Sequence, residues 1–444
     1  MASRSALVAG GRVTGASVAY ALRDRGVAVT VCDRARTAQA DELEAAGIPY
    51  LVDENPPVAG YDQLVVSPGI RPDHPLVVAA AAAGVEVLGD VELAWRLRRP
   101  GTAWLALTGT NGKTTTVRML AAMLAAAGHD AVAAGNVGLP LLDAVLAGHD
   151  VLAVELSSFQ LYWTSTLAVH AGAVLNLAPD HLDWHGSMAA YAEAKARIWR
   201  GAGRCVGNAD DPAVMELLRG VGGRTLTFTL RDPEPGQYGI RDGHLVGPAG
   251  EPLIPAAEVR PAGPHNVANA LAAAALAGTY GVPAGAVAAG LRAFVPDPHR
   301  NQTVATIDGV TWVDDSKATN PHAAGASLSG YPRVVWVAGG LLKGASVDRL
   351  VADHAHRLAG AVLLGTDRAI VAEAIARHAP DVPVVEVERT DDGAMAEVVR
   401  AAGGLARAGD VVLLAPAAAS VDMFRDYAAR GDAFVTAVRL LGGT

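Results

Sequence analysis

A glycine-rich segment that runs into a lysine and two threonines carries the clearest chemical signal. Residues 108–115 read Thr-Gly-Thr-Asn-Gly-Lys-Thr-Thr and follow the apolar run 103–107. A strand, a loop and a helix in this order place backbone N–H groups around an anion, at the positive end of the helix. Lys113 can then reach the β- and γ-phosphates of a nucleotide, and Thr114 can offer its hydroxyl to Mg²⁺. Leu107 stands where the standard motif has its first glycine, so we predict a shortened phosphate-binding loop rather than a plain turn.

Two more polar segments directly follow apolar runs. Glu155 ends the run 151–154, and the segment 176–186, which contains His181, follows the run 172–175. A carboxylate at the carboxyl end of a parallel strand lies in the crevice where ligands bind, so we predict that Glu155 holds Mg²⁺. Polar residues this dense are costly after a buried strand unless they bind something. His181 is therefore a candidate metal ligand; the alternative is a loop histidine with local hydrogen bonds.

Lys195 lies in an alanine-rich segment that predicts a helix over about 187–200. Spacing alone favours a surface lysine whose stem covers apolar surface.

The glycine-rich turn at 10–15, Gly-Gly-Arg-Val-Thr-Gly, follows the short apolar run 6–9. Arg12 occupies the middle glycine of the dinucleotide fingerprint, while Asp33 ends the next apolar run at about the distance of a ribose-binding acid. The segment can bind a nucleotide, but it does not support NAD. A purely structural role, in which these glycines only form the turn between a strand and a helix, explains them about as well.

The apolar runs predict strands that alternate with helical segments, which is typical of parallel α/β sheets. A polar break at 98–101 and a proline-rich stretch at 295–298 suggest three domains: 1–98, 99–297 and 298–444. We expect a Rossmann-like first domain, a central P-loop domain with a mostly parallel sheet, and a Rossmann-like third domain. The predicted strands are residues 6–9, 28–32 and 64–66, then 103–107, 151–154 and 172–175, then a hairpin of 303–307 and 310–313, and finally 334–337, 361–364, 382–387 and 411–414.

Composition narrows the classes of function. The 444 residues carry a formal net charge of −9, and no Lys/Arg block stands out, so a nucleic-acid or membrane partner is not expected. Two cysteines, Cys32 and Cys205, make a disulfide framework improbable and fit a reduced cytoplasmic setting. The most apolar window, 76–88, is too short to span a bilayer. We expect a cytoplasmic monomer that acts on small molecules.

Six motifs, in their order along the chain, resemble the Mur ligases of peptidoglycan precursor synthesis. They are TGTNGKTTT at 108–116, ELSSFQ at 155–160, DHLD at 180–183, HNVANA at 265–270, DSKATN at 315–320 and APAAAS at 415–420. The resemblance covers essentially the whole chain. It implies a UDP-binding domain, a central ATPase and a C-terminal domain that carries the amino acid. It also implies a reaction in which ATP phosphorylates a carboxylate and an amine attacks the acyl phosphate. The last two motifs narrow the resemblance to members that join D-glutamate to UDP-MurNAc-L-alanine.

The resemblance also implies roles for individual residues. Lys113, Glu155, His181 and Lys195 match catalytic positions. The matched ATP contacts are Gly109, Thr110, Asn111, Gly112, Lys113, Thr114, Thr115, Asn266, Asn269, Arg300 and Asp315. The matched UDP-substrate contacts are Val13, Thr14, Asp33, Arg34, Ser67, Gly69 and Asn136. The matched D-glutamate contacts are Lys317, Thr319, Lys343, Ser420 and Tyr427. Two Mg²⁺ ions are implied, with ligands among Thr114, Glu155, His181 and Lys195. Lys195 matches a family lysine that is carbamylated, which reverses the surface interpretation.

Three departures from the family pattern stand out. Arg12 replaces a glycine in the UDP loop, Gln302 stands where an acid is common, and Ala418 stands where cysteine is common. Four alternative functions remain open from the sequence. They are another Mur ligase, a folylpolyglutamate synthase, a P-loop regulatory or transport ATPase, and a nucleotide-dependent oxidoreductase.

Overall fold

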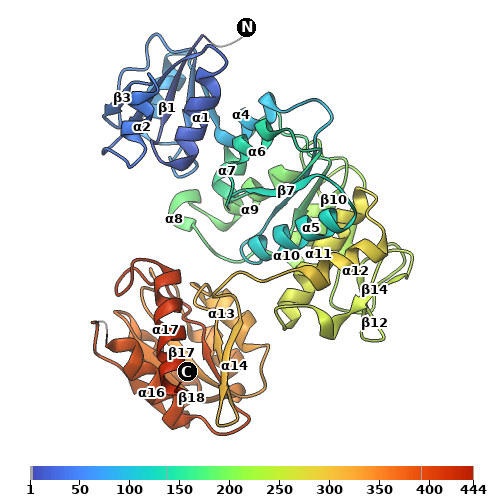
Figure 1. The fold of residues 1–444 in the computed structure, drawn as a ribbon, viewed down its shortest axis with the longest axis vertical. Helices are drawn as coiled ribbons and strands as arrows, with labels where there is room; N and C mark the ends of the chain where they lie inside the picture. The colour runs from blue at the N-terminus through green and yellow to red at the C-terminus, as the bar shows by residue number, and fades with distance from the viewer. Residues whose placement is uncertain (1–3, 137, 392, 444) are drawn as a thin grey trace. The chain divides into compact units, whose positions relative to one another are not determined.

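The structure is a computed structural model that describes residues 4–136, 138–391 and 393–443. The chain folds into α/β domains built on three large sheets (Figure 1). It divides into two compact units, each described here by itself. One comprises Met1–Pro255 and Asn269–Phe294, and the other comprises Ala256–Ala268 and Val295–Thr444.

The N-terminal sheet has five parallel strands in the order β3-β2-β1-β4-β5. Ala6 and Val8 of β1 join the same apolar core as α1 and α4, while Leu7 and Ala9 pack with α3. This alternation covers both faces, as a parallel sheet requires. The elements are β1 (Ser5–Ala9), α1 (Val13–Arg23), β2 (Ala28–Asp33), α2 (Ala40–Ala45), β3 (Tyr50–Val52), β4 (Gln63–Val66), α3 (Pro75–Ala82), β5 (Glu86–Gly89) and α4 (Asp90–Leu97).

The central sheet has six parallel strands in the order β11-β10-β9-β6-β8-β7. Because β6 lies between β9 and β8, the loops after these three strands meet at one edge. The elements are β6 (Ala103–Thr108), α5 (Lys113–Ala126), β7 (Ala131–Gly135), α6 (Leu141–Ala147), β8 (Val151–Glu155), α7 (Ser158–Tyr162), β9 (Ala171–Val174), α8 (Leu182–His185), α9 (Met188–Ala196), a 3₁₀ turn (Arg197–Trp199), β10 (Cys205–Asn208), α10 (Pro212–Arg219) and β11 (Thr225–Phe228).

A small antiparallel sheet and two helices follow. The sheet consists of β12 (Gly239–Arg241), β13 (His244–Val246) and β14 (Pro252–Pro255). The helices are α11 (Pro264–Thr279) and α12 (Ala284–Ala293), and α12 packs closely along α5.

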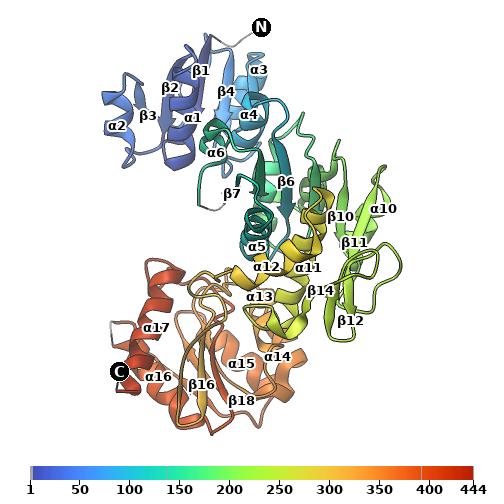
Figure 2. The same ribbon diagram turned by 45° about the vertical axis from the view of Figure 1, so that its right-hand side comes forward.

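The C-terminal sheet has six strands in the order β15-β16-β20-β17-β18-β19. Helices α13, α14 and α15 cover one face and α16 and α17 the other (Figure 2). Strand β15 is antiparallel to β16, as the predicted hairpin requires, and the other neighbours are parallel. The elements are β15 (Gln302–Ile307), β16 (Val310–Asp314), α13 (Pro321–Leu328), β17 (Val334–Gly339), α14 (Asp348–His354), β18 (Leu358–Leu364), α15 (Arg368–His378), β19 (Val384–Glu386), α16 (Ala394–Leu405), β20 (Val411–Leu414) and α17 (Tyr427–Leu441).

The predicted strands are all present. The sequence interpretation missed several short ones, such as β3 and β7, because three residues or an alanine-rich run give little periodic signal. Among the described residues, no helix combines the length and the apolar character needed to cross a membrane.

Candidate active site

The phosphate loop lies between β6 and α5, as predicted, and a neighbouring loop braces it. Asn176 follows β9 and binds the loop on both sides of Asn111. Its Oδ1 accepts from the Asn111 N–H at 2.8 Å, and its Nδ2 donates to the Asn111 carbonyl at 3.0 Å. Gly112 has φ of +82°, and a Cβ there would lie 2.3 Å from Asn269 Oδ1. The loop therefore needs glycine at 112 both for its backbone and to admit Asn269.

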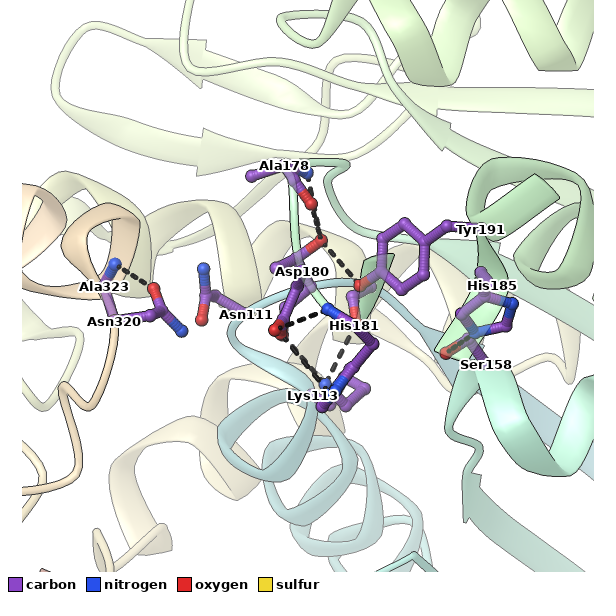
Figure 3. Close-up of polar contacts among 12 residues, drawn as sticks. Asn111, Lys113, Ser158, Ala178, Asp180, His181, His185, Tyr191, Asn320 and Ala323 are labelled. Carbon is purple, nitrogen blue, oxygen red and sulfur yellow. Dashed lines mark hydrogen bonds and ion pairs between the residues drawn. The ribbon is translucent and has the colours of Figure 1, made fainter. Parts of the chain in front are cut away.

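Lys113 begins α5 with its amine turned toward the loop. Its Nζ donates to the carbonyls of Gly109 at 3.0 Å and Thr110 at 2.9 Å. Figure 3 shows Lys113, Asp180 and His181 directed toward one another beside this loop. The helix start and the lysine together place positive potential at one point, which suits a polyphosphate.

Glu155 ends β8 and is buried. Its Oε1 accepts from Asn136 Nδ2 at 2.8 Å, and the Asn136 N–H donates to the Glu155 carbonyl at 2.9 Å. Oε2 is buried without a hydrogen-bond partner among the described residues. An unpaired buried carboxylate oxygen is costly, and a hard cation is the partner it fits. Glu155 thus fits a Mg²⁺ ligand, and Asn136, predicted as a substrate contact, also orients that carboxylate.

Lys195 is buried, so the interpretation of it as a surface lysine is wrong. Its helix packs over the phosphate loop, and its Nζ donates to Gly109 O at 2.8 Å. The amine lies 4.6 Å from the centre of the Tyr191 ring, whose hydroxyl is 3.0 Å from Thr110 Oγ1. Burial lowers the pKa of Lys195 well below its ordinary value, and the nearby Lys113 cation lowers it further. The neutral amine that carbamylation requires is therefore favoured here.

His181 precedes the one-turn helix α8 with φ of +52°. Its ring centre lies 4.7 Å from that of Phe159, and its Nε2 is 3.5 Å from the Asp180 carboxylate. Partial burial lowers the pKa of His181, which favours the neutral imidazole that can ligate a metal. No three His, Cys, Asp or Glu side chains gather as a metal site within the described ranges. Of the four predicted metal ligands, Thr114, Glu155, His181 and Lys195, only Glu155 and His181 are His, Cys, Asp or Glu, so the predicted ligands cannot form such a group of three.

Side chains hold α8 in place. Trp184 Nε1 donates to the Gly69 carbonyl at 3.2 Å, and His185 Nε2 lies 2.9 Å from Ser158 Oγ. Burial lowers the pKa of His185 to about 4, so this ring is also neutral at pH 7. The segment that carries His181 is thereby joined to the loop that carries Gly69.

In the N-terminal sheet, the predicted UDP contacts gather where β1, β2 and β4 end. Asp33 Oδ2 accepts from the Gly11 N–H at 2.8 Å, so part of its role is to hold the turn. A Cβ at Gly10 would lie 2.1 Å from Ser67 Oγ, which explains that glycine. Arg12 has φ of −84° and an exposed side chain, so its backbone does not require the family glycine. Val13 and Thr14 begin α1, and the exposed Arg34 follows β2.

The remaining predicted ATP contacts lie in the second unit. Asp315 is bound by the Asn301 N–H at 3.1 Å and by the Ser327 hydroxyl, and burial raises its pKa to about 6. Asn266 is buried against Ala262 and His265, while Arg300 pairs loosely with Asp297 at 3.5 Å.

At position 302, where the family often has an acid, the glutamine makes a hydrogen bond that an acid could also make. Gln302 Oε1 accepts from the His299 N–H at 3.2 Å, a bond that a carboxylate oxygen would also accept.

The predicted D-glutamate contacts lie on loops after three neighbouring strands. Lys317 and Thr319 follow β16, Lys343 follows β17, and Ser420 follows β20; Tyr427 begins α17. Backbone bonds join these loops. Ala417 N donates to Ala318 O at 2.9 Å, and Leu341 and Ala419 exchange two bonds of 2.9 Å.

Sequence reasoning included Asn176 only as part of the polar segment 176–186 and missed Tyr191, although both contact the phosphate loop. The position of Asn176 directly after β9 was a usable signal, because β9 neighbours β6. Tyr191 lies four residues before Lys195, on the same helical face, but its contact with Thr110 required the fold.

Family models match three parts of the chain. They are described as "Mur ligase MurD-like, N-terminal domain" for residues 4–89, "Mur ligase middle domain" for residues 107–277 and "Mur ligase, glutamate ligase domain" for residues 299–418. Curated proteins match over nearly the whole length. The chain belongs to the Mur ligase family. It is 55% identical to a Streptomyces avermitilis protein named UDP-N-acetylmuramoylalanine–D-glutamate ligase, over 99% of this chain and 98% of that protein. Proteins of the same name match at 56% in Thermobifida fusca, over 99% of both chains, and at 50% in Mycobacterium bovis, over 98% of this chain and 95% of that one.

Solved Mur ligase structures share the fold. The UDP-N-acetylmuramate–alanine ligase MurC of Thermotoga maritima superposes with a TM-score of 0.61 at 20% identity, covering 99% of this chain and all of that one. MurF of Acinetobacter baumannii gives 0.60 at 20% identity, covering 92% and 86% of the two chains. These likenesses establish the three-domain α/β architecture of this Mur ligase.

Proposed function

We propose that this Mur ligase joins D-glutamate to UDP-N-acetylmuramoyl-L-alanine with consumption of ATP, in the assembly of peptidoglycan precursors. One observation carries the assignment: curated D-glutamate ligases are 50–56% identical over nearly the whole chain. The solved structures of MurC, of MurF and of FolC from E. coli match at only 18–20% identity, which supports the fold alone.

Membership of the Mur ligase family implies the chemistry, and the phosphate loop offers the groups that it needs. The substrate carboxylate attacks the γ-phosphorus of ATP, ADP leaves, and the acyl phosphate then loses phosphate when the D-glutamate amine attacks. Lys113 and the N–H groups of residues 109–115 hold the phosphates in line and stabilise the charge that moves between them. Holding both substrates in one geometry removes most of the entropic cost of their encounter.

The proposed Mg²⁺ site rests on Glu155, whose buried Oε2 lacks a protein partner among the described residues. We propose that two Mg²⁺ ions bind in this region. Their protein ligands would be Thr114, Glu155, His181 and carbamylated Lys195. When bound, Mg²⁺ neutralises charge on the phosphoryl oxygens. Asn136 fixes the carboxylate of Glu155, and Tyr191 and Gly109 hold the head of Lys195 beside the loop.

The substrate sites are proposed domain by domain. Residues 1–98 supply most contacts to the UDP substrate, residues 99–297 supply most contacts to ATP, and residues 298–444 supply the contacts to D-glutamate together with Arg300 and Asp315 for ATP. The assigned UDP-substrate contacts are Val13, Thr14, Asp33, Arg34, Ser67, Gly69 and Asn136. The assigned ATP contacts are residues 109–115 with Asn266, Asn269, Arg300 and Asp315. The assigned D-glutamate contacts are Lys317, Thr319, Lys343, Ser420 and Tyr427. We further propose a cytoplasmic monomer.

Phosphate release tests the proposal. It should require ATP, Mg²⁺, UDP-MurNAc-L-alanine and D-glutamate together, with L-glutamate and UDP-MurNAc as matched controls. Equal turnover with L-glutamate, or with UDP-MurNAc that lacks the alanine, would refute the assignment.

A further inference from the structure

A buried arginine lies behind the loops that carry the proposed D-glutamate contacts. Arg430 of α17 is only 1% exposed, and all three of its guanidinium nitrogens have partners. Nε donates to Ser316 Oγ at 3.0 Å, Nη2 to the Ser316 carbonyl at 2.9 Å, and Nη1 to the Ala418 carbonyl at 3.1 Å. Burial lowers its pKa to about 10, so it remains a cation at pH 7.

Each partner lies beside a proposed acceptor contact. Ser316 directly precedes Lys317, and Ala418 is two residues before Ser420. The Ser316 hydroxyl donates onward to the Tyr427 carbonyl at 2.7 Å, and Lys317 Nζ lies 3.8 Å from the centre of the Tyr427 ring. One guanidinium thus joins the loop after β16, the loop after β20 and the start of α17.

The chemistry of this position calls for arginine. Three separate nitrogens in a planar fork meet three acceptors that point in from two loops, and a lysine ammonium on its flexible stem lacks that geometry. A buried cation would also be costly without these bonds. The role of Arg430 in the fold is therefore geometric rather than a matter of exposed charge.

We propose that Arg430 is a positioning residue for the amino-acid substrate: it sets Lys317, Ser420 and Tyr427 at the spacing that two carboxylates require. This inference rests on the proposed function, because it assumes that these loops hold D-glutamate. Arg430 does not touch the substrate and acts through Ser316 and Ala418.

The test compares Arg430→Lys and Ser316→Ala with Arg425→Lys in the full-length enzyme. Arg425 is a matched control on the same segment, because its side chain is 86% exposed and pairs with the adjacent Asp426. We expect Arg430→Lys to raise the D-glutamate KM about tenfold or more, the loss typical of one misaligned charge-assisted hydrogen bond. The ATP and UDP-substrate KM values should change less than about twofold, and Arg425→Lys should match the wild type.

Ser316→Ala decides the question if Arg430→Lys does not fold. It removes the bridge to Tyr427 and leaves two of the arginine's bonds, so the D-glutamate KM should again rise selectively. An unchanged D-glutamate KM in either folded variant overturns the inference, and so does an equal rise in all three KM values, which marks a general structural role. A wild type without D-glutamate-dependent phosphate release instead refutes the proposed function, and this inference with it.

Discussion

At the scale of single residues, burial changes what Lys195 and Glu155 can do. An exposed lysine is a cation and an exposed glutamate is satisfied by water. Here the amine is pushed toward its neutral form, and one carboxylate oxygen lacks a partner among the described residues. Both effects suit a metal-phosphate site, because a neutral amine can react with CO₂ and a bare carboxylate oxygen can bind Mg²⁺.

We predict that Lys195→Ala nearly abolishes turnover and that formate or acetate restores part of it. A small carboxylate can occupy the space of the missing carbamate and supply the same oxygen ligand. Lys113→Ala with the same additives is the matched control, since a carboxylate cannot replace a cation. Full activity of Lys195→Ala without additive would contradict the carbamate.

A second residue-scale prediction concerns pH. His299 Nδ1 lies 2.6 Å from Asp314 Oδ2, and this hydrogen bond raises the pKa of His299. Because the folded pKa exceeds the unfolded value of about 6.5, the stabilisation is complete below that pH and is lost as pH rises through the folded pKa. Urea unfolding should therefore show stability falling from pH 6 to pH 9 less steeply in His299→Gln than in the wild type. If stability fell equally steeply with pH in both proteins, His299 would not be the source of the pH dependence.

At the scale of elements, close packing between helices positions the phosphate loop. Helix α5 begins at Lys113 and packs against α12. The contact is close because Gly290 of α12 is buried against the backbone of α5: a Cβ there would lie 2.5 Å from Met123 Cα. Gly285, on the same helix, has open space around its Cα.

This pair of glycines gives a matched prediction. Alanine is normally the better helix former by about 0.5–1 kcal/mol, so Gly285→Ala should be neutral or slightly stabilising. Gly290→Ala must push α12 away from α5, at a cost of roughly 1–3 kcal/mol. Thermal unfolding measures the change in stability of each variant, and the ATP KM measures whether displacement of α12 disturbs α5 and the phosphate loop at its start. A Gly290→Ala protein as stable as the wild type would show that the helices separate without strain.

At the scale of the whole molecule, the proposed sites are distributed over separate sheets. Each sheet places its loops at the carboxyl ends of neighbouring strands, where parallel α/β sheets bind ligands. The assigned UDP-substrate contacts other than Asn136 belong to the sheet around β1, whereas the phosphate loop belongs to the sheet around β6.

Separate sheets predict separable defects. Lys113→Ala should lower turnover by about 10²-fold or more, because its charge matters most in the transition state. Calorimetric binding of UDP-MurNAc-L-alanine should survive. Loss of both in a folded variant would contradict the assignment of the two substrates to different domains.

The α/β class, the predicted strands and the phosphate loop could all be predicted from the amino-acid sequence. These follow from local order: an apolar strand, a glycine-rich turn and a helix follow one another without interruption from Ala103 to Ala126 and constrain one another. The hairpin around Asp308-Gly309 is confirmed for the same reason, because its turn type is set by two adjacent residues. The family resemblance supplied the catalytic roles, which spacing alone did not give.

The burial of individual side chains and the contacts between loops could not be predicted from local sequence and emerged from the three-dimensional fold. The spacing of residues predicted a surface position for Lys195, because an alanine-rich helix shows no clear apolar face. Its burial depends instead on β6 and on the phosphate loop against which it packs. Asn176 and Arg430 likewise gain their roles from partners 65 and 114 residues away. Strand order sets such contacts, and no local pattern encodes strand order, since it is chosen by how all the helices and strands can bury their apolar faces at once.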